Sequence, residues 1–512
     1  MSARKRARIL KNRKRRIEYR LRDRVWEEQA EPMFTAGNIH YQLSDRCGAL
    51  DAGGIGAIHL LARRTGLIDA IDRKLHLLKI HLPYHESDHV LNVAYNILCG
   101  GERLEHIELR RNNEVYLDAL GTQRIPDPTT EGDFCRRFQE GDIEDLMDAT
   151  NQVRLGVWSR QPAGFFDQAI IEADGTLAPT HGECKAGMDI SYNGVWGYHP
   201  LVVSLANTAE PLYLVNRSGS RPSNEGAAER FDQAIELCRQ AGFREILLRG
   251  DTDFTQTHHL DGWDEEGVKF LFGIDARPNL VEMAAKLPEK QWDRLTRPAK
   301  YEVCTQPRER PDNVKEQIVK QRGFENIRLV CEDVAEFDYR PGACRQAYRV
   351  VVVRKNRSVE RGELRLFDEI QYFFYITNLR DLPLPQTVFC ANDRCNQENL
   401  IEQLKNGVKA LNMPVDNLVS NWAYMVMASL AWTLKAWIGL ILPEAGRWAE
   451  KHKEEKDAVL KMEFKTFLNA FMRVPCQIVR TGRRIVYRLL SWNPWQHVFL
   501  RAVDALRRPL RC

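Results

Sequence analysis

The stretch from residue 164 to residue 275 limits the fold most, because short apolar runs alternate there with amphipathic segments. GFFDQAIIEADGT (164–176) and REILLRGD (244–251) are apolar runs that end in acidic turns. Between them, residues 224–242 carry apolar side chains at helical spacing. Uninterrupted apolar runs are typical of strands at the buried centre of a sheet. The predicted order is three strands, a helix, a strand, a helix and a strand, which is an α/β fold with mixed pairing.

Changes in the pattern of apolar and charged residues along the chain predict its domain organisation. A chain of 512 residues is too long for one small core. We expect an α/β core in two parts, a β-rich insertion between them, and helical regions at both ends. The predicted segments are a basic N-terminal arm (1–44), a helical DNA-binding domain (45–155), the first part of the core (160–275), the insertion (276–370), the second part of the core (371–420), and a helical C-terminal region with a basic tail (421–512).

Charge is strongly segregated within a chain whose net charge is only +4. Residues 1–24 hold twelve Lys or Arg against two acidic residues, and residues 473–512 hold nine Arg against one Asp. Two basic arms around an acidic middle suggest a polyanionic partner. A solvated tail is the alternative for the first arm, whose centre we interpret as a DNA contact formed by Arg13, Lys14, Arg15 and Arg16.

One apolar segment, residues 421–442, is long enough to cross a bilayer. It contains Lys435 and stands alone, so we predict a buried helix in a protein without a membrane partner. The basic N-terminus has no apolar signal segment. The twelve cysteines form no CxxC pair, which favours reduced thiols. These features predict a cytoplasmic protein.

Two acidic turns follow predicted strands. Asp174 ends the first apolar run and Asp251 ends the second. Functional groups in open α/β sheets lie at strand ends, where a side chain is exposed and held rigidly. A single Asp there is more often a turn or helix cap. Asp253 is a nearby rival to Asp251, and Glu172 could assist Asp174 from the same strand face. Converging carboxylates are the ligands that Mg²⁺ prefers.

A later helix could supply a third carboxylate. In ANDRCNQENLIEQLK (391–405), Arg394, Glu398, Glu402 and Lys405 fall within roughly 40° of one another on a helix. A solvated surface with i,i+4 ion pairs is the ordinary interpretation. The alternative is a metal-binding carboxylate between two cations, with Glu402 as the rival to Glu398.

These motifs together resemble a known family. Arg394, three residues, Glu398, six residues and Lys405 match the R-x3-E-x6-K signature of bacterial insertion-sequence transposases with a DDE triad on an RNase H-like fold. The stretches IIEADGTLAPTHG, YNGVWGYHPLVV, LLRGDTDF and NQENLIEQLKNGVKAL resemble one subgroup, the IS-thirteen-eighty group. The resemblance covers roughly residues 45–470. It implies an RNase H-like mixed sheet with helices on both faces.

The resemblance also implies roles for single residues. Asp174, Asp251 and Glu398 would be the catalytic triad and would bind Mg²⁺, with Mn²⁺ as a substitute. Arg394 and Lys405 would contact DNA phosphate. The family's fuller signature has a tyrosine three residues before the arginine, where this chain has Ala391. Any phosphate contact from that tyrosine is therefore absent or replaced.

The function that the resemblance implies is cut-and-paste transposition. The protein would bind the terminal inverted repeats of its element, cut the DNA in a metal-dependent reaction, and join the ends to target DNA. Relatives act as dimers, so we expect a homodimer on DNA in the bacterial cytoplasm, associated with the nucleoid. The alternatives are a transposase-derived DNA-binding protein without strand transfer and an RNase H-like nuclease or resolvase.

Overall fold

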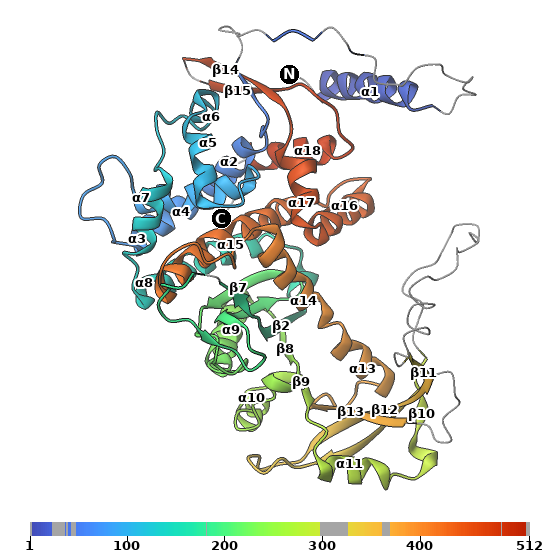
Figure 1. The fold of residues 1–512 in the computed structure, drawn as a ribbon. Helices are drawn as coiled ribbons and strands as arrows, with labels where there is room; N and C mark the ends of the chain where they lie inside the picture. Colours follow the sequence, from blue (N-terminus) through green and yellow to red (C-terminus); the bar gives the residue numbers. More distant parts are fainter. Residues whose placement is uncertain are drawn as a thin grey trace. The chain divides into compact units, whose positions relative to one another are not determined.

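The computed structural model describes residues 3–22, 36, 39–41, 48–180, 182–296, 326–360, 369–482 and 484–507. The chain forms two compact units (Figure 1). One comprises residues 1–161, 182–186 and 403–512, and the other comprises residues 162–181 and 187–402. The helices expected near the two chain ends therefore share one unit.

The first unit is mainly helical. Helices from both ends of the chain pack together, since α15 lies against α4 and α8 and α18 lies against α2. Its elements are α1 (Ala3–Arg20), β1 (Ala49–Leu50), α2 (Ile55–Thr65), α3 (Leu67–Lys74), α4 (Glu86–Leu98), α5 (Ile107–Arg111), α6 (Glu114–Leu120), α7 (Pro128–Cys135), α8 (Glu140–Trp158), α15 (Leu418–Leu440), α16 (Ala449–Lys461), α17 (Phe464–Phe467), β14 (Cys476–Thr481), β15 (Arg484–Leu489) and α18 (Gln496–Arg507).

The apolar segment predicted as a buried helix is α15. It is long and apolar enough to cross a membrane, yet its most apolar window is 100% buried inside the protein. Lys435 is fully buried and donates from Nζ to the Leu460 carbonyl at 2.6 Å, over the ring of Trp432. Burial lowers the pKa of Lys435 to about 7. The helix is thus the core of the helical unit, as predicted.

The two basic arms contact each other. Helix α1 is mostly exposed, but Arg6 pairs with Asp504 of α18 at 2.6 Å. Arg13 donates to the Leu489 and Ser491 carbonyls at 3.1 and 2.8 Å. Several cations of the C-terminal arm also have acidic partners: Arg480 with Asp118 and Arg501 with Glu455. Part of the positive charge of the two arms is therefore paired with acidic residues or carbonyl groups of the protein itself.

The second unit is built on a mixed sheet with the order β10-β11-β12-β13-β9-β8-β2-β6-β7. Strands β2, β8 and β9 run parallel and the other pairs are antiparallel. The predicted β-rich insertion extends this sheet through β11 and β12. The bounds are β2 (Gln168–Gly175), β6 (Leu201–Leu205), β7 (Glu210–Val215), β8 (Glu245–Gly250), β9 (Lys269–Ile274), β10 (Asp293–Arg294), β11 (Asn326–Tyr339), β12 (Tyr348–Glu360) and β13 (Glu369–Thr377). A small sheet joins β3 (Ala178–Pro179), β5 (Trp196–Tyr198) and β4 (Asp189–Ile190).

Helices cover both faces of the large sheet, as predicted. On one face, Phe231 of α9 (Ala227–Ala241) and Trp263 of α10 (Leu260–Glu265) contact Phe272 of β9. On the other face, Ala391 of α13 (Leu384–Asn392) packs against Leu247 and Leu271. Leu271 and Phe272 are consecutive, and successive strand residues point to opposite faces. A further helix, α11 (Pro278–Ala285), follows β9.

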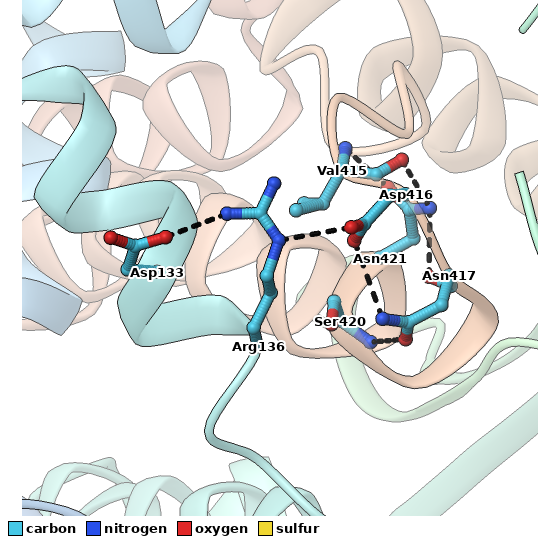
Figure 2. Close-up of polar contacts among 7 residues, drawn as sticks. All are labelled: Asp133, Arg136, Val415, Asp416, Asn417, Ser420 and Asn421. Atoms are coloured by element: carbon cyan, nitrogen blue, oxygen red, sulfur yellow. Dashed lines mark hydrogen bonds and ion pairs between the residues drawn. The ribbon is translucent and has the colours of Figure 1, made fainter. Parts of the chain in front are cut away.

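The loop before α15 is held by one buried amide and one exposed ion pair (Figure 2). Asn421 is fully buried, accepts from the Val415 N–H at 2.9 Å and donates to the Val415 carbonyl at 3.0 Å. Asp416 accepts from Arg136 at 3.0 Å, and that pair is about half exposed. The buried amide satisfies backbone groups that water cannot reach, whereas the ion pair competes with water.

These two contacts predict different costs on substitution. Asn421→Ala should lower the free energy of unfolding by roughly 2–4 kcal/mol, because two buried backbone groups lose their partner. Arg136→Ala should cost less than about 1 kcal/mol, as for other exposed pairs. Urea unfolding of the two variants checks this. Equal destabilisation would contradict the assignment of the loop's stability to Asn421.

Candidate functional site

The two predicted aspartates lie at one edge of the sheet because β2 and β8 are parallel neighbours. The register pairs Gln168 with Glu245 and Glu172 with Arg249. Extended by two residues, the same register aligns Asp174 with Asp251. Asp174 is the penultimate residue of β2, and Asp251 follows β8 directly. Strand pairing alone therefore brings together two carboxylates that are far apart in sequence.

The third predicted carboxylate is carried by α14 (Cys395–Glu402), which follows α13 after a short break. Gln397 anchors this helix to the sheet, because its buried amide donates to the Val202 carbonyl at 3.0 Å and accepts from the Ser204 hydroxyl. Val202 pairs with Asp174 across β6 and β2. Gln397 thus fixes the first turn of α14, where Glu398 lies, to the strand beside Asp174.

Arg394 joins the three carboxylates. Its guanidinium lies 3.5 Å from Asp174 Oδ2, 3.6 Å from Asp251 Oδ2 and 3.4 Å from Glu398 Oε1. The Arg394 and Asp174 side chains are 23% and 16% exposed, whereas Glu398 is 59% exposed. One cation is therefore shared among three anions, two of which are largely shielded from water.

The pKa values of the two aspartates reflect their burial and the negative charges around them. Burial, followed by repulsion from Asp251, raises the pKa of Asp174 to about 7, although Arg394 opposes the shift. Burial also raises the pKa of Asp251. Asp251 has a second task, because its other oxygen accepts from the Asp253 N–H at 3.0 Å and caps a short 3₁₀ turn. Burial, with repulsion from Asp251 second at Asp174, therefore outweighs the favourable contact with Arg394.

A buried ion pair supports the site from beneath. Arg249 Nε donates to Glu172 Oε1 at 2.7 Å, and Arg249 Nη1 donates to the Cys390 carbonyl of α13 at 2.7 Å. Glu172 and Arg249 each lie two residues before a predicted ligand, on the same face. Glu172 is predicted from the sequence only as an assistant to Asp174, and Arg249 is not predicted. The position of Arg249 two residues before Asp251, on the same strand face, is the sequence signal for it.

The two rivals are exposed. Asp253 offers its backbone N–H to Asp251, and Glu402 lies at the end of α14. Lys405 lies in a π-helical turn over Gln403–Gly407, where a period of 100° per residue does not apply. Its alignment with Glu398 stays a prediction. Ala391 is buried between Leu247 and Leu271, so this position faces the core.

The arm residues lie in the other unit, on α1. Arg13 contacts backbone carbonyls and Lys14 pairs with Glu18 at 3.4 Å, while Arg15 and Arg16 are exposed.

Comparison with known proteins identifies the family. Residues 49–510 match the family model described as Transposase DDE domain group 1. The chain therefore belongs to this family of transposases, which are DNA transposition and recombination proteins that typically use divalent metal ions.

One solved structure that the chain resembles is a piggyBac transposase synaptic complex with hairpin DNA. The identity is 11%, the TM-score is 0.32, and the match covers 82% of this chain and 87% of that one. No curated protein matches the sequence.

The charge imbalance predicts an unusual effect of a conservative substitution in the metal-free protein. The folded pKa of Asp174 lies above its ordinary value of 3.8, so folding disfavours its ionised form. The resulting loss of stability begins as pH rises through about 4 and is complete above about 7. Asp174→Asn removes this loss and should stabilise the metal-free protein by roughly 2–4 kcal/mol at pH 8, with little effect near pH 3.5.

Thermal unfolding in EDTA across this pH range checks the prediction. The exposed Asp275 provides a matched control, since Asp275→Asn should shift the unfolding temperature equally at each pH. A destabilising Asp174→Asn at pH 8 would show that Arg394 already compensates the buried charge.

Proposed function

We propose that this transposase cuts DNA at the ends of its element and joins the freed 3′-hydroxyl groups to target DNA, with Asp174, Asp251 and Glu398 as the catalytic residues. The observation that carries the proposal is the contact of one guanidinium with three carboxylates from three separate segments. A surface helix with local ion pairs would not bring Glu398 to the same cation as two strand-end aspartates.

The donor set suits a divalent cation of the Mg²⁺ type, with Mn²⁺ as a substitute. All three side chains offer carboxylate oxygens, which hard cations prefer. Within the described part of the chain, these three carboxylates do not form a cluster with all ligand atoms within 4.8 Å. They surround Arg394 instead, and Glu398 is the most exposed of the three side chains. Two bound ions would activate the attacking oxygen and stabilise the leaving oxygen during phosphoryl transfer.

The chain's own residues have distinct tasks in this proposal. Asp174 and Asp251 are held rigidly by the strand register, whereas Glu398 is oriented by the anchored first turn of α14. Arg394 balances part of the carboxylate charge in the metal-free protein. Once the carboxylates bind a cation, Arg394 is free to contact a DNA phosphate beside them. Lys405 is a second candidate for phosphate contact.

The proposed partners are the terminal inverted repeats and target DNA, bound in part by the helical module over residues 45–155. Cutting and joining two ends together calls for at least two protein chains, so we infer a homodimer on DNA. Mass measurement of the protein with repeat DNA tests this state, and one chain holding both ends would exclude it. Within the family, the quoted motifs favour the bacterial IS-thirteen-eighty group.

Substitution of the triad should separate catalysis from binding. Asp174→Asn, Asp251→Asn and Glu398→Gln should each reduce Mg²⁺-dependent cleavage at the repeat boundary by roughly a thousandfold or more, since each removes a ligand oxygen worth several kcal/mol. Binding to repeat DNA should persist. Asp253→Asn and Glu402→Gln are matched controls that should keep activity.

The same variants decide between related functions. Pre-cut ends with a free 3′-hydroxyl should be joined to target DNA by the wild-type protein and the controls only. Cleavage without joining would identify a nuclease or resolvase. Loss of activity in Glu402→Gln with retention in Glu398→Gln would assign the third catalytic carboxylate to Glu402, one helical turn after Glu398.

The exposed arginines of α1 should add sequence-independent affinity. Each neutralised phosphate releases condensed counterions, which makes log K fall with log salt by about 0.9 per contact. The double variant Arg15→Gln/Arg16→Gln should reduce this slope by about two and weaken binding to repeat and random duplexes alike. Lys286→Gln/Lys290→Gln removes the same charge from exposed positions of the other unit. Equal slopes in both doubles would mean that α1 is only a solvated extension.

A further inference from the structure

A second cluster of ligand side chains lies in the helical unit, before α4. His81, His85 and Glu86 each offer one ligand atom, and these atoms all lie within 4.8 Å of one another. Among the residues that the structure describes, this is the group of three that meets that spacing. His81 and His85 belong to the segment between α3 and α4, and Glu86 is the first residue of α4. All three lie in a different compact unit from Asp174, Asp251 and Glu398.

The carboxylate of this cluster is already oriented. Glu86 is 1% exposed, and its Oε1 accepts from the Leu78 N–H at 2.9 Å. Its Oε2 lies 3.0 Å from His81 Nε2. A buried carboxylate that is held by a backbone N–H and directs its other oxygen toward an imidazole is oriented to bind a cation.

The two imidazoles complete the arrangement. Their rings stack with centroids 4.3 Å apart and planes 18° apart, and both histidines are exposed. The 3.0 Å separation of Nε2 and Oε2 is close to the roughly 3.4 Å between two ligands of a tetrahedral Zn²⁺. Because both side chains are exposed, the rings can rotate out of this near-parallel stack and each direct a nitrogen toward one ion without displacing core side chains.

We propose that His81, His85 and Glu86 form a binding site for Zn²⁺ or a similar borderline transition-metal ion. Two imidazole nitrogens and one carboxylate oxygen select Zn²⁺, Ni²⁺ or Cu²⁺ over Mg²⁺. Three protein ligands leave a fourth position open to water, since both histidines face solvent. The site is independent of the proposed catalytic centre.

The expected role of the ion is to clamp the segment between α3 and α4. Leu78 and His81 are already tied to Glu86 at the start of α4. Pro83 and Tyr84 of the same segment line a cavity of about 340 Å³, together with Tyr95 and Tyr116. An ion held by His81 and His85 would fix this wall of the cavity to α4. It would thereby stiffen part of the helical module proposed to bind DNA.

Zinc titration of the EDTA-treated full chain tests the site. In millimolar MgCl₂, which keeps carboxylate sites occupied, calorimetry should show one Zn²⁺ per chain, and Zn²⁺ should raise the unfolding temperature. His81→Ala/His85→Ala should lower the affinity by on the order of a hundredfold or more. Co²⁺ in place of Zn²⁺ should give visible d–d absorption without a thiolate charge-transfer band, which separates this site from the exposed Cys184.

Matched controls make the outcome decisive. His76→Ala/His258→Ala removes two other exposed histidines and should bind Zn²⁺ like the wild type. Asp174→Asn/Asp251→Asn should also keep the zinc response, so failure of the catalytic proposal would leave this one standing. The proposal is overturned if the wild type binds no stoichiometric Zn²⁺ at micromolar concentration, or if His81→Ala/His85→Ala binds it with unchanged affinity.

Discussion

The parallel pairing of β2 with β8 is the constraint on which the candidate site depends. Its register places Glu172 beside Arg249 and, when extended by two residues, Asp174 beside Asp251. Side chains alternate along a strand, so all four lie on the face covered by α13 and α14. A shift of one residue in either strand would turn one aspartate into the opposite face, where α9 packs. The buried pair of Glu172 and Arg249 opposes such a shift, because it would leave two charges without partners.

The carboxylate charge at this edge of the sheet determines which ligands the edge can bind. Three carboxylates share one guanidinium, and burial together with repulsion from Asp251 raises the pKa of Asp174 despite that cation. A protein that only needed a stable edge would gain by replacing one carboxylate with an apolar residue. Retained anionic charge of this kind is suited to binding cations and, through them, phosphate. The cost in stability and the proposed catalytic function have the same electrostatic origin.

Cationic charge is divided differently in the helical unit. Arg6, Arg480 and Arg501 have acidic partners there, whereas Arg15 and Arg16 are exposed on α1. The net charge of the two arms therefore exceeds the positive charge that remains available to contact DNA phosphate. At the start of α4, two exposed imidazoles and one buried carboxylate form the proposed transition-metal site. Each unit thus has its own electrostatic character.

Local patterns were sufficient to predict the strands that end in Asp174 and Asp251, the buried α15 and the position of Glu398 next to Arg394. These features depend on apolar runs and on i,i+4 spacing, which are written in consecutive residues. Three others required the folded chain. The π turn over Gln403–Gly407 and the core position of Ala391 against Leu247 and Leu271 are not apparent from local spacing. The contact of Arg394 with both aspartates depends on strand pairing across 77 residues. Sequence determined which groups carry charge, and tertiary structure decided which of them share a cation, because only chain folding sets distances between segments.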